Sequence, residues 1–401
     1  MKKHASLLVS LLLLLSLFAP ATLAEDEVIH IWHDCDAGIV ETMETAVNAL
    51  LAGTGVSVVF EKQTNLTDQL KLYGNDPVNG PDMYFFAHDS LGTFTAMGIL
   101  EPAASLLSDG ATADLLPMTL QAGTIDDTQY LLPVYYETLL FMYNKDLWEG
   151  DLPGTTEDLY AYMEAHTDTA AGTYALVNQH SGAYNVAPYI YGFGAYIIRE
   201  DGSIGLNTPE MIEAVTYNKK FAALEADGDY NTVTTLFNEQ KAAAIIGGPW
   251  LISGIHEAGI DLGIRSLAEF KLPNGNGLAP FSGVQSLGVL KYAAEAKGEA
   301  IGQVLEAFTD VSVGIALANS SNCAPANGKA YEDEAVLANE MIMAIRETAE
   351  TAQPMPNIPE MGVMWGPVET MLVSVNQSGA SVEDAAQKAQ ADAEQAVADM
   401  R

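Results

Sequence analysis

The first hundred residues alternate short, mostly apolar runs with amphipathic segments. The runs at 28–32, 56–60 and 82–86 predict strands, whereas 39–51 and 65–73 carry apolar residues at helical spacing and predict helices. Strand, helix and strand in this order are typical of βαβ units, in which neighbouring strands are parallel. The pattern therefore indicates an α/β fold.

The same alternation continues through the rest of the chain. Residues 129–143, 243–246 and 283–290 predict further strands. Thr155 precedes two early acidic residues, which is typical of a helix N-terminus. The Ala-, Gln- and acid-rich segment 381–400 predicts a long C-terminal helix.

Acidic side chains follow two of the predicted strands. Asp34 and Asp36 come after the first strand, and Asp89 comes after the third. In open parallel sheets a ligand binds outside the carboxyl ends of the strands. We therefore expect these carboxylates to face a ligand.

The first 24 residues have a composition of their own. Lys2 and Lys3 precede an apolar run, Leu7–Phe18, and small residues lead to Ala24. This pattern predicts a secretory signal peptide cleaved after Ala24. A membrane anchor is the alternative, but the run is shorter than the roughly 20 residues that a spanning helix needs. Because no cysteine follows for lipid attachment, we expect an exported, soluble, periplasmic protein.

The composition of the chain excludes several classes of protein. Its 401 residues include 17 Lys+Arg and 53 Asp+Glu, with a net charge of −36, and loss of Lys2 and Lys3 with the signal peptide makes this −38. A hydrophobic fraction of 49% argues against disorder, and the length indicates about two domains. Neither nucleic acid nor an anionic membrane is an expected partner, since both are bound through clustered Lys and Arg.

Cys35 and Cys323 are the only cysteines. Two cysteines exclude a disulfide-rich scaffold and a multi-cysteine metal site. In an exported protein they predict either one disulfide or two separate thiols, and the sequence leaves both open.

The acidic residues permit three kinds of chemistry. The run His33–Asp36 includes metal-binding residue types, but adjacent strand residues point to opposite faces, so we expect no metal site. An aspartyl nucleophile would need a nearby Thr or Ser and a Lys, which are not evident. Asp36, Asp89 and Glu137 could serve an exported glycan-active hydrolase through paired carboxylates. In so acidic a chain such placements arise by chance, and we expect no enzyme and no cofactor.

Four aromatic residues lie beside glycines, prolines or carboxylates rather than inside apolar stripes. Aromatic rings stack on the C–H faces of sugars, and carboxylates accept hydrogen bonds from sugar hydroxyls. The alternative is that each ring belongs to a core. Together they suit a carbohydrate site, and they are Phe86, Tyr184, Trp250 and Trp365.

Several motifs point to one family. They are Gly-Pro-Asp at 80–82 with Phe-Ala-His-Asp at 86–89, Tyr-Asn-Lys-Asp-Leu at 143–147, Gly-Pro-Trp at 248–250, and Met-Pro-Asn-Ile-Pro at 355–359 followed by Trp365. In order and spacing the chain resembles the maltose/maltodextrin-binding proteins of ABC importers, within extracellular solute-binding protein family 1. This resemblance implies a two-lobed periplasmic-binding-protein fold of type II. Each lobe would be a mostly parallel sheet flanked by helices, with the ligand cleft between the lobes.

The resemblance also implies domain limits and partners. The chain would cross between the lobes near 135–139, 281–285 and 332–338. An oligosaccharide such as maltose or maltodextrin would be captured by hinge closure and passed to the transmembrane subunits of the importer, and we expect a monomer. Lobe one would comprise 25–134 plus 284–333, and lobe two 135–283 plus 334–401.

Position by position, the resemblance places ligand contacts on both sides of the cleft. Rings that stack on the sugar from lobe two would be Tyr184, Trp250 and Trp365. Contacts from lobe one and the hinge would be Asp34, Asp36, Phe86, Asp89 and Glu137, and Glu369 of lobe two is the ninth candidate contact.

The chain departs from the family at five cleft positions. Ala37, Ser90 and Glu369 stand where the family has basic residues, Gly366 replaces a ring, and Phe86 replaces a tryptophan. Because an unpaired buried carboxylate is costly, the ligand or a neighbour must compensate for Glu369 and the other acids. Our hypothesis is that the ligand is a sugar that differs from maltose, being smaller, differently linked or amino-bearing.

Overall fold

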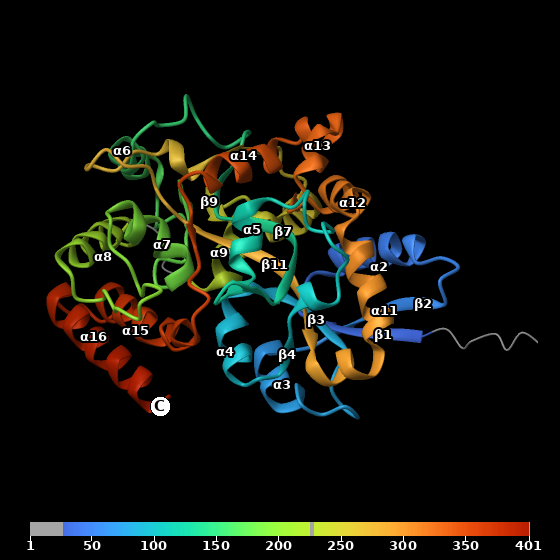
Figure 1. Ribbon diagram of the computed structural model, residues 1–401. Coiled ribbons are helices and arrows are strands. Elements are labelled where there is room, and N and C mark those ends of the chain that lie inside the picture. Colours follow the sequence, from blue (N-terminus) through green and yellow to red (C-terminus); the bar gives the residue numbers. More distant parts are fainter. Residues whose placement is uncertain (1–26, 225–227, 401) are drawn as a thin grey trace, which may run out of the picture.

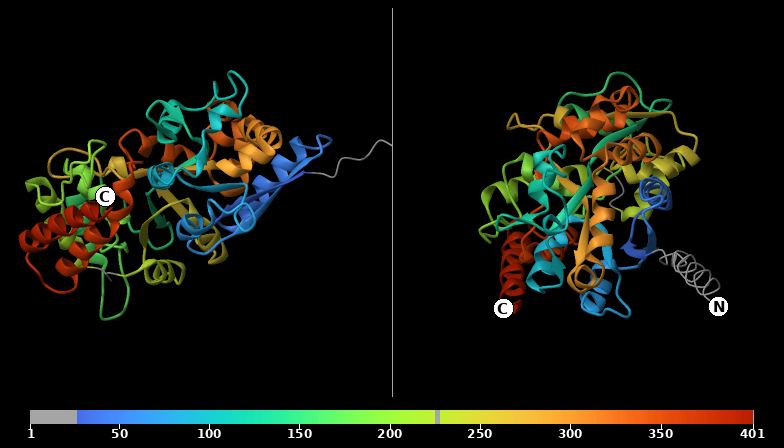
Figure 2. Two further views of the ribbon diagram at one scale, coloured as in Figure 1. Left: turned by 60° about the horizontal axis from the view of Figure 1, so that its bottom comes forward. Right: turned by 45° about the vertical axis from the view of Figure 1, so that its right-hand side comes forward.

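The computed structural model describes residues 27–224 and 228–400. The predicted signal peptide lies outside these residues. Two lobes lie side by side, as the left view of Figure 2 shows, with the blue, cyan and orange segments on one side and the green and red segments on the other. The predicted two-lobed α/β fold is therefore confirmed.

The first lobe contains a mixed sheet in the order β12-β7-β11-β3-β1-β2, with β4 and β13 pairing on β11. Its three parallel strands and the helices between them agree with the sequence prediction to within two residues. Their bounds are β1 (Glu27–His33), α2 (Ala37–Leu50), β2 (Val56–Lys62), α3 (Leu66–Tyr73) and β3 (Met83–Ala87). The other strands of this sheet are β4 (Leu100–Glu101), β7 (Leu131–Thr138), β11 (Phe281–Leu290), β12 (Ala324–Pro325) and β13 (Gln353–Pro354).

The second lobe contains a three-stranded sheet in the order β10-β8-β9. Its strands are β8 (Leu140–Asn144), β9 (Ala244–Gly247) and β10 (Leu262–Arg265). Helices α7, α8, α15 and α16 gather at one end of this lobe (Figure 1). The helices that belong to it are α6 (Thr156–His166), α7 (Ala183–Gly192), α8 (Pro209–Ala222), α9 (Tyr230–Asn238), α10 (Ile252–Glu257), α15 (Trp365–Asn376) and α16 (Val382–Asp399).

The remaining elements pack around the first sheet and between the lobes. Among the described residues no single helix is long and apolar enough to cross a membrane, and only α11 and α12, bent by 60°, pass that test as a pair. The elements are α4 (Leu91–Ala96), α5 (Pro117–Ala122), the hairpin of β5 (Thr124–Ile125) and β6 (Thr128–Gln129), α11 (Lys291–Thr309), α12 (Val311–Ser321), α13 (Glu334–Leu337) and α14 (Glu340–Ala349).

Two helix predictions are confirmed in detail. The Thr155 side chain caps α6 by accepting a hydrogen bond from the backbone N–H of Asp158. The Ser381 side chain caps α16 in the same way, by accepting a hydrogen bond from the backbone N–H of Asp384. Each cap satisfies a backbone donor that the first turn of a helix leaves unpaired.

The expectation of mostly parallel sheets holds only for part of the first sheet. β1 pairs in parallel with β2 and with β3, but β11 is antiparallel to both β3 and β7. In the second lobe β8 is antiparallel to β9 and to β10. The physical reason in the first sheet is that β7 leads the chain out of this lobe and β11 leads it back, so the two run in opposite directions.

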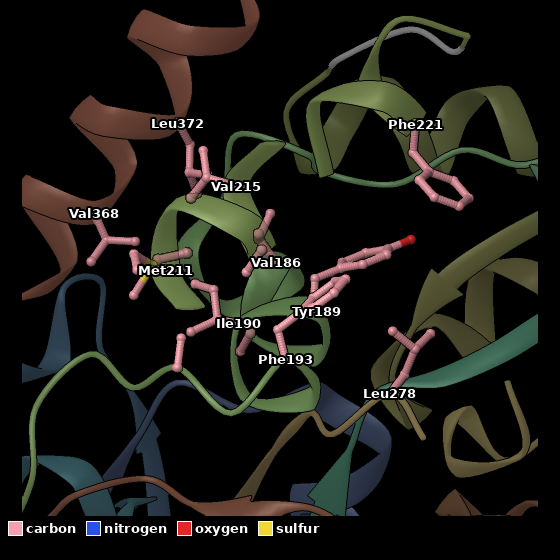
Figure 3. Close-up of a cluster of buried hydrophobic side chains, with 14 of the residues drawn as sticks. Val186, Tyr189, Ile190, Phe193, Met211, Val215, Phe221, Leu278, Val368 and Leu372 are labelled. Atoms are coloured by element: carbon pink, nitrogen blue, oxygen red, sulfur yellow. The ribbon is translucent and has the colours of Figure 1, made fainter. Parts of the chain in front are cut away.

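Each lobe has its own hydrophobic core, and β7 and β11 connect them. Leu132 on β7 and Leu287 on β11 are fully buried in the core of the first lobe. Leu139, directly after β7, and Phe281, at the start of β11, are fully buried in the core of the second lobe. Figure 3 shows part of this second core, in which side chains of α7, α8 and α15 meet. β7 and β11 therefore pass from one core into the other, at the place where the family resemblance implies a hinge, and they are called the hinge strands below.

Candidate functional site

Seven of the nine ligand contacts predicted from the sequence line one cavity of about 340 Å³. It opens at the carboxyl end of β3 and beside the hinge strands, and residues of both lobes form its wall. Asp34 and Asp36 do not line it. Its residues are Phe86, Ala87, Asp89, Glu137, Tyr184, Trp250, Gly283, Met355, Trp365 and Glu369.

One wall of the cavity is aromatic. The Tyr184 ring lies 6.2 Å from the Trp250 ring between centroids and 6.1 Å from Phe281, nearly parallel to the latter. Phe281 in turn meets Trp365 edge to face at 5.9 Å. Phe281 is fully buried and contacts Tyr184 and Trp365, whereas Tyr184, Trp250 and Trp365 are partly exposed and line the cavity.

Carboxyl groups line the cavity together with these rings. The Nε2 of Gln285 donates a 2.8 Å hydrogen bond to Oε1 of Glu137. Burial, together with the charges of Asp34 and Asp36, raises the pKa of Glu137 to about 7 despite that bond. Burial and the charge of Asp34 raise the pKa of Asp89 to about 6, although backbone N–H groups bond its carboxylate. Both carboxyls therefore titrate close to neutral pH.

Asp34 and Asp36 are exposed in the loop between β1 and α2. Burial of part of its carboxylate raises the pKa of Asp34, and Lys62 partly opposes this effect. Since their charges act on Glu137, both aspartates lie next to the cavity. Their direct contact with a ligand stays a prediction.

His88 joins the lobe-one sheet to the hinge segment. The backbone N–H of Val284 donates to its Nδ1 at 3.1 Å, so Nε2 carries the proton and donates to the carbonyl of Met355 at 3.0 Å. Burial lowers the pKa of His88 to about 4. A neutral imidazole thus fixes the position of Asp89, the next residue, relative to β11.

Cys35 and Cys323 are free thiols. Of the two alternatives that the sequence left open, the structure has two separate thiols and not a disulfide. Each thiol is hydrogen-bonded to the Tyr135 hydroxyl. Burial raises the pKa of both thiols, which disfavours the thiolate that disulfide formation requires.

Sequence reasoning missed four residues that shape the site. Phe281 supports the aromatic rings, Gln285 holds Glu137, and Gly283 and Met355 line the cavity. Met355 belongs to one of the family motifs, so its position was a usable signal. Phe281, Gly283 and Gln285 fall in an apolar strand pattern that indicates only a core strand.

The positions that depart from the family have different surroundings. Glu369 is exposed at the cavity, whereas Ser90 is buried in the short helix His88–Ser90 and Ala37 is exposed at the start of α2. Gly366 is exposed on α15, and a Cβ there would meet no atom within 4 Å outside its chain neighbours and the backbone of the helix. Within residues 27–224 and 228–400 no three His, Cys, Asp or Glu side chains are grouped to hold a metal ion.

Larger hollows exist on the molecule. One of about 660 Å³ is lined by Arg199, Asp201 and the segment 353–357, and another of about 500 Å³ lies between α2 and β2. The cavity of about 340 Å³ is the better candidate site. Of these three cavities, it is the one lined both by partly exposed aromatic rings and by carboxyl groups with raised pKa values.

Replacing Glu137 by Gln is expected to stabilise the ligand-free protein in a pH-dependent way. The pKa of Glu137 in the folded state, about 7, exceeds its ordinary value of 4.5, so ionisation costs stability as pH rises from 4.5 to 7. With partial exposure taken into account, the cost is about 1–2 kcal/mol. The Tm of Glu137→Gln should match wild type at pH 4 and exceed it by about 1–3 °C at pH 8.

The matched control for this measurement is Glu213→Gln, which removes an exposed carboxylate of α8. Its Tm should follow wild type at both pH values. Equal Tm values for wild type and Glu137→Gln at pH 8 would contradict the burial of an ionisable Glu137.

The chain is similar to proteins of known class. A model of the family described as bacterial extracellular solute-binding protein matches residues 37–310. The chain is 31% identical to the galactooligosaccharide-binding protein of Bacillus subtilis (strain 168) over 80% of this chain and 77% of that protein. It is 27% identical to the maltotriose-binding protein of Pyrococcus abyssi (strain GE5 / Orsay), over 84% and 75% of the two chains.

A solved structure shares the fold. The crystal structure of a cyclo/maltodextrin-binding protein complexed with maltotetraose superposes with a TM-score of 0.79, covering 92% of this chain and 97% of that one at 24% identity. Together with the family match over residues 37–310, these similarities show that the chain belongs to the bacterial extracellular solute-binding proteins.

Proposed function

We propose that this protein is the substrate-binding component of an ABC importer and that it captures an oligosaccharide in the cavity described above. The observation that carries the proposal is the pairing of partly exposed rings, Tyr184, Trp250 and Trp365, with the carboxyl groups of Asp89 and Glu137 around one cavity. Rings stack on the apolar faces of a sugar while carboxylates accept bonds from its hydroxyls. The saccharides named for the relatives support the same ligand class.

The mechanism is closure of the two lobes on the ligand. Lobe one comprises 25–134 plus 284–333 and lobe two 135–283 plus 334–401, with the hinge where β7 and β11 pass between the cores. A ligand that touches both lobes favours the closed state by its differential affinity for that state. Asp89 on one side and Trp365 on the other are the contacts that closure would bring onto the same sugar.

The cellular setting follows from the same proposal. The signal peptide is cleaved after Ala24, the monomer works in the periplasm, and the closed form docks on the transmembrane subunits of the importer. The protein carries out no covalent chemistry on its ligand.

A glycan-active hydrolase is the second candidate, because carboxyl groups with raised pKa values, such as Glu137 and Asp89, are typical of general acids. A binding protein returns the saccharide unchanged, whereas a hydrolase produces shorter products. Chromatography of the saccharide after incubation with the protein therefore separates the two functions.

Saccharides are expected to raise the Tm of the purified protein. At a ligand concentration 100 times the Kd, binding stabilises the folded state by about 2.7 kcal/mol, which corresponds to about 3–4 °C for a chain of this length. The panel comprises maltose, maltotriose, trehalose, galactooligosaccharides and amino sugars, with amino acids and peptides as the comparison. A Tm rise with peptides and with no saccharide of the panel would contradict the proposal.

A further inference from the structure

The cavity has an excess of negative charge that nothing in its wall balances. Asp89, Glu137 and Glu369 are among its ten lining residues, which include no Lys, Arg or His. The charged groups that influence Asp89 and Glu137 are Asp34 and Asp36, and these are acidic as well. Lys62 is a partner of Asp34 but does not line the cavity. A closed cleft would thus enclose several carboxylates without a protein cation.

Enclosing this charge around an uncharged ligand is unfavourable. Transfer of an ionised carboxylate away from water costs several kcal/mol unless a counter-charge or hydrogen bonds compensate. Sugar hydroxyls supply hydrogen bonds but no charge. Burial is the main cause of the raised pKa values of Asp89 and Glu137, and the charges of Asp34 and Asp36 add to it, so a cation beside these groups would favour their ionised forms.

The aromatic wall suits a cation for an independent reason. The faces of aromatic rings attract ammonium groups within about 6 Å, and tryptophan does so most strongly. Trp250 and Trp365 line the cavity together with Tyr184 and Phe86, and all four rings are partly exposed.

We propose that the ligand of this cleft is a saccharide bearing a protonated amine, whose ammonium group lies between the carboxylates Asp89, Glu137 and Glu369 and the aromatic rings. This inference rests on the proposed function, because it names the class of saccharide for the same site. The ammonium group supplies the counter-charge that the wall lacks, while the rings stack on the sugar.

Isosteric pairs of sugars test the proposal directly. Glucose and glucosamine, galactose and galactosamine, and cellotriose and the fully deacetylated chitosan trisaccharide differ only in a hydroxyl or an ammonium group at the 2-position. In calorimetry at pH 7 and 50 mM NaCl, the amine of at least one pair should bind at least tenfold more tightly than its neutral partner. This preference should shrink at 500 mM NaCl, since salt screens charge–charge attraction.

A matched pair of variants assigns the preference to the cavity. Glu369→Gln removes an exposed carboxylate at the cavity and should reduce the preference for the amine at least threefold, while Glu213→Gln on α8 should leave it unchanged. Equal or tighter binding of every neutral partner would overturn the inference and leave the proposed function standing. Binding of neither member of any pair, nor of any other saccharide, would overturn the proposed function and this inference with it.

Discussion

Replacing Phe281 by alanine should lower the free energy of unfolding by about 3–5 kcal/mol and also weaken ligand binding. The ring is fully buried and lies against Tyr184, Tyr191 and Trp365, with centroids 6.1, 5.0 and 5.9 Å away. Alanine leaves a cavity at the start of β11, where that strand enters the core of the second lobe, and frees two rings of the site. Chemical denaturation followed by circular dichroism measures the first effect, and calorimetry with the best ligand of the screen measures the second.

Phe94→Ala is the matched control. Phe94 is also fully buried, but it lies on α4 in the core of the first lobe, edge to face with Tyr84. Its loss should destabilise the protein to a similar degree and leave the affinity unchanged. If both variants bind the ligand as tightly as wild type, Phe281 does not position the site.

Part of the fold could not be predicted from the sequence, because it depends on contacts between residues far apart in the chain. The strands and helices from Glu27 to Ala87 follow from local periodicity, because side-chain alternation and helical spacing are properties of neighbouring residues. That β11 would insert between β3 and β7 depends on pairing between residues far apart in the chain. Periodicity predicts that 283–290 is a strand, but it gives no information about which strands pair with it or in which direction.

The same limit applies to the site itself. Local motifs located Asp89, Trp250 and Trp365, and the structure brings them to one cavity. Phe281 and Gln285 act through residues that reach them only after the lobes have folded, so no motif marks them. The sequence also does not reveal that the two free thiols, Cys35 and Cys323, are both hydrogen-bonded to the Tyr135 hydroxyl.

Trp365→Ala should weaken saccharide binding by about 1–2 kcal/mol, which is about a five- to thirtyfold rise in Kd. Trp365 begins α15, and its partly exposed ring lines the cavity while its edge contact with Phe281 fixes its orientation. Truncating a stacked ring costs this amount of binding free energy, because the sugar face that the ring covered becomes exposed to water. Calorimetry with wild type and variant measures the loss, and the ligand-dependent change in tryptophan fluorescence should shrink as well.

Two further variants separate stacking from a general loss of packing. Trp365→Phe keeps an aromatic face and should retain most of the affinity. Tyr162→Ala removes a ring that stacks on Trp148 at 4.0 Å and does not line the cavity, so it should lower stability without changing Kd. If Trp365→Ala binds as tightly as wild type, Trp365 is not a ligand contact, and Trp250 and Tyr184 remain the rings that could stack on the sugar from lobe two.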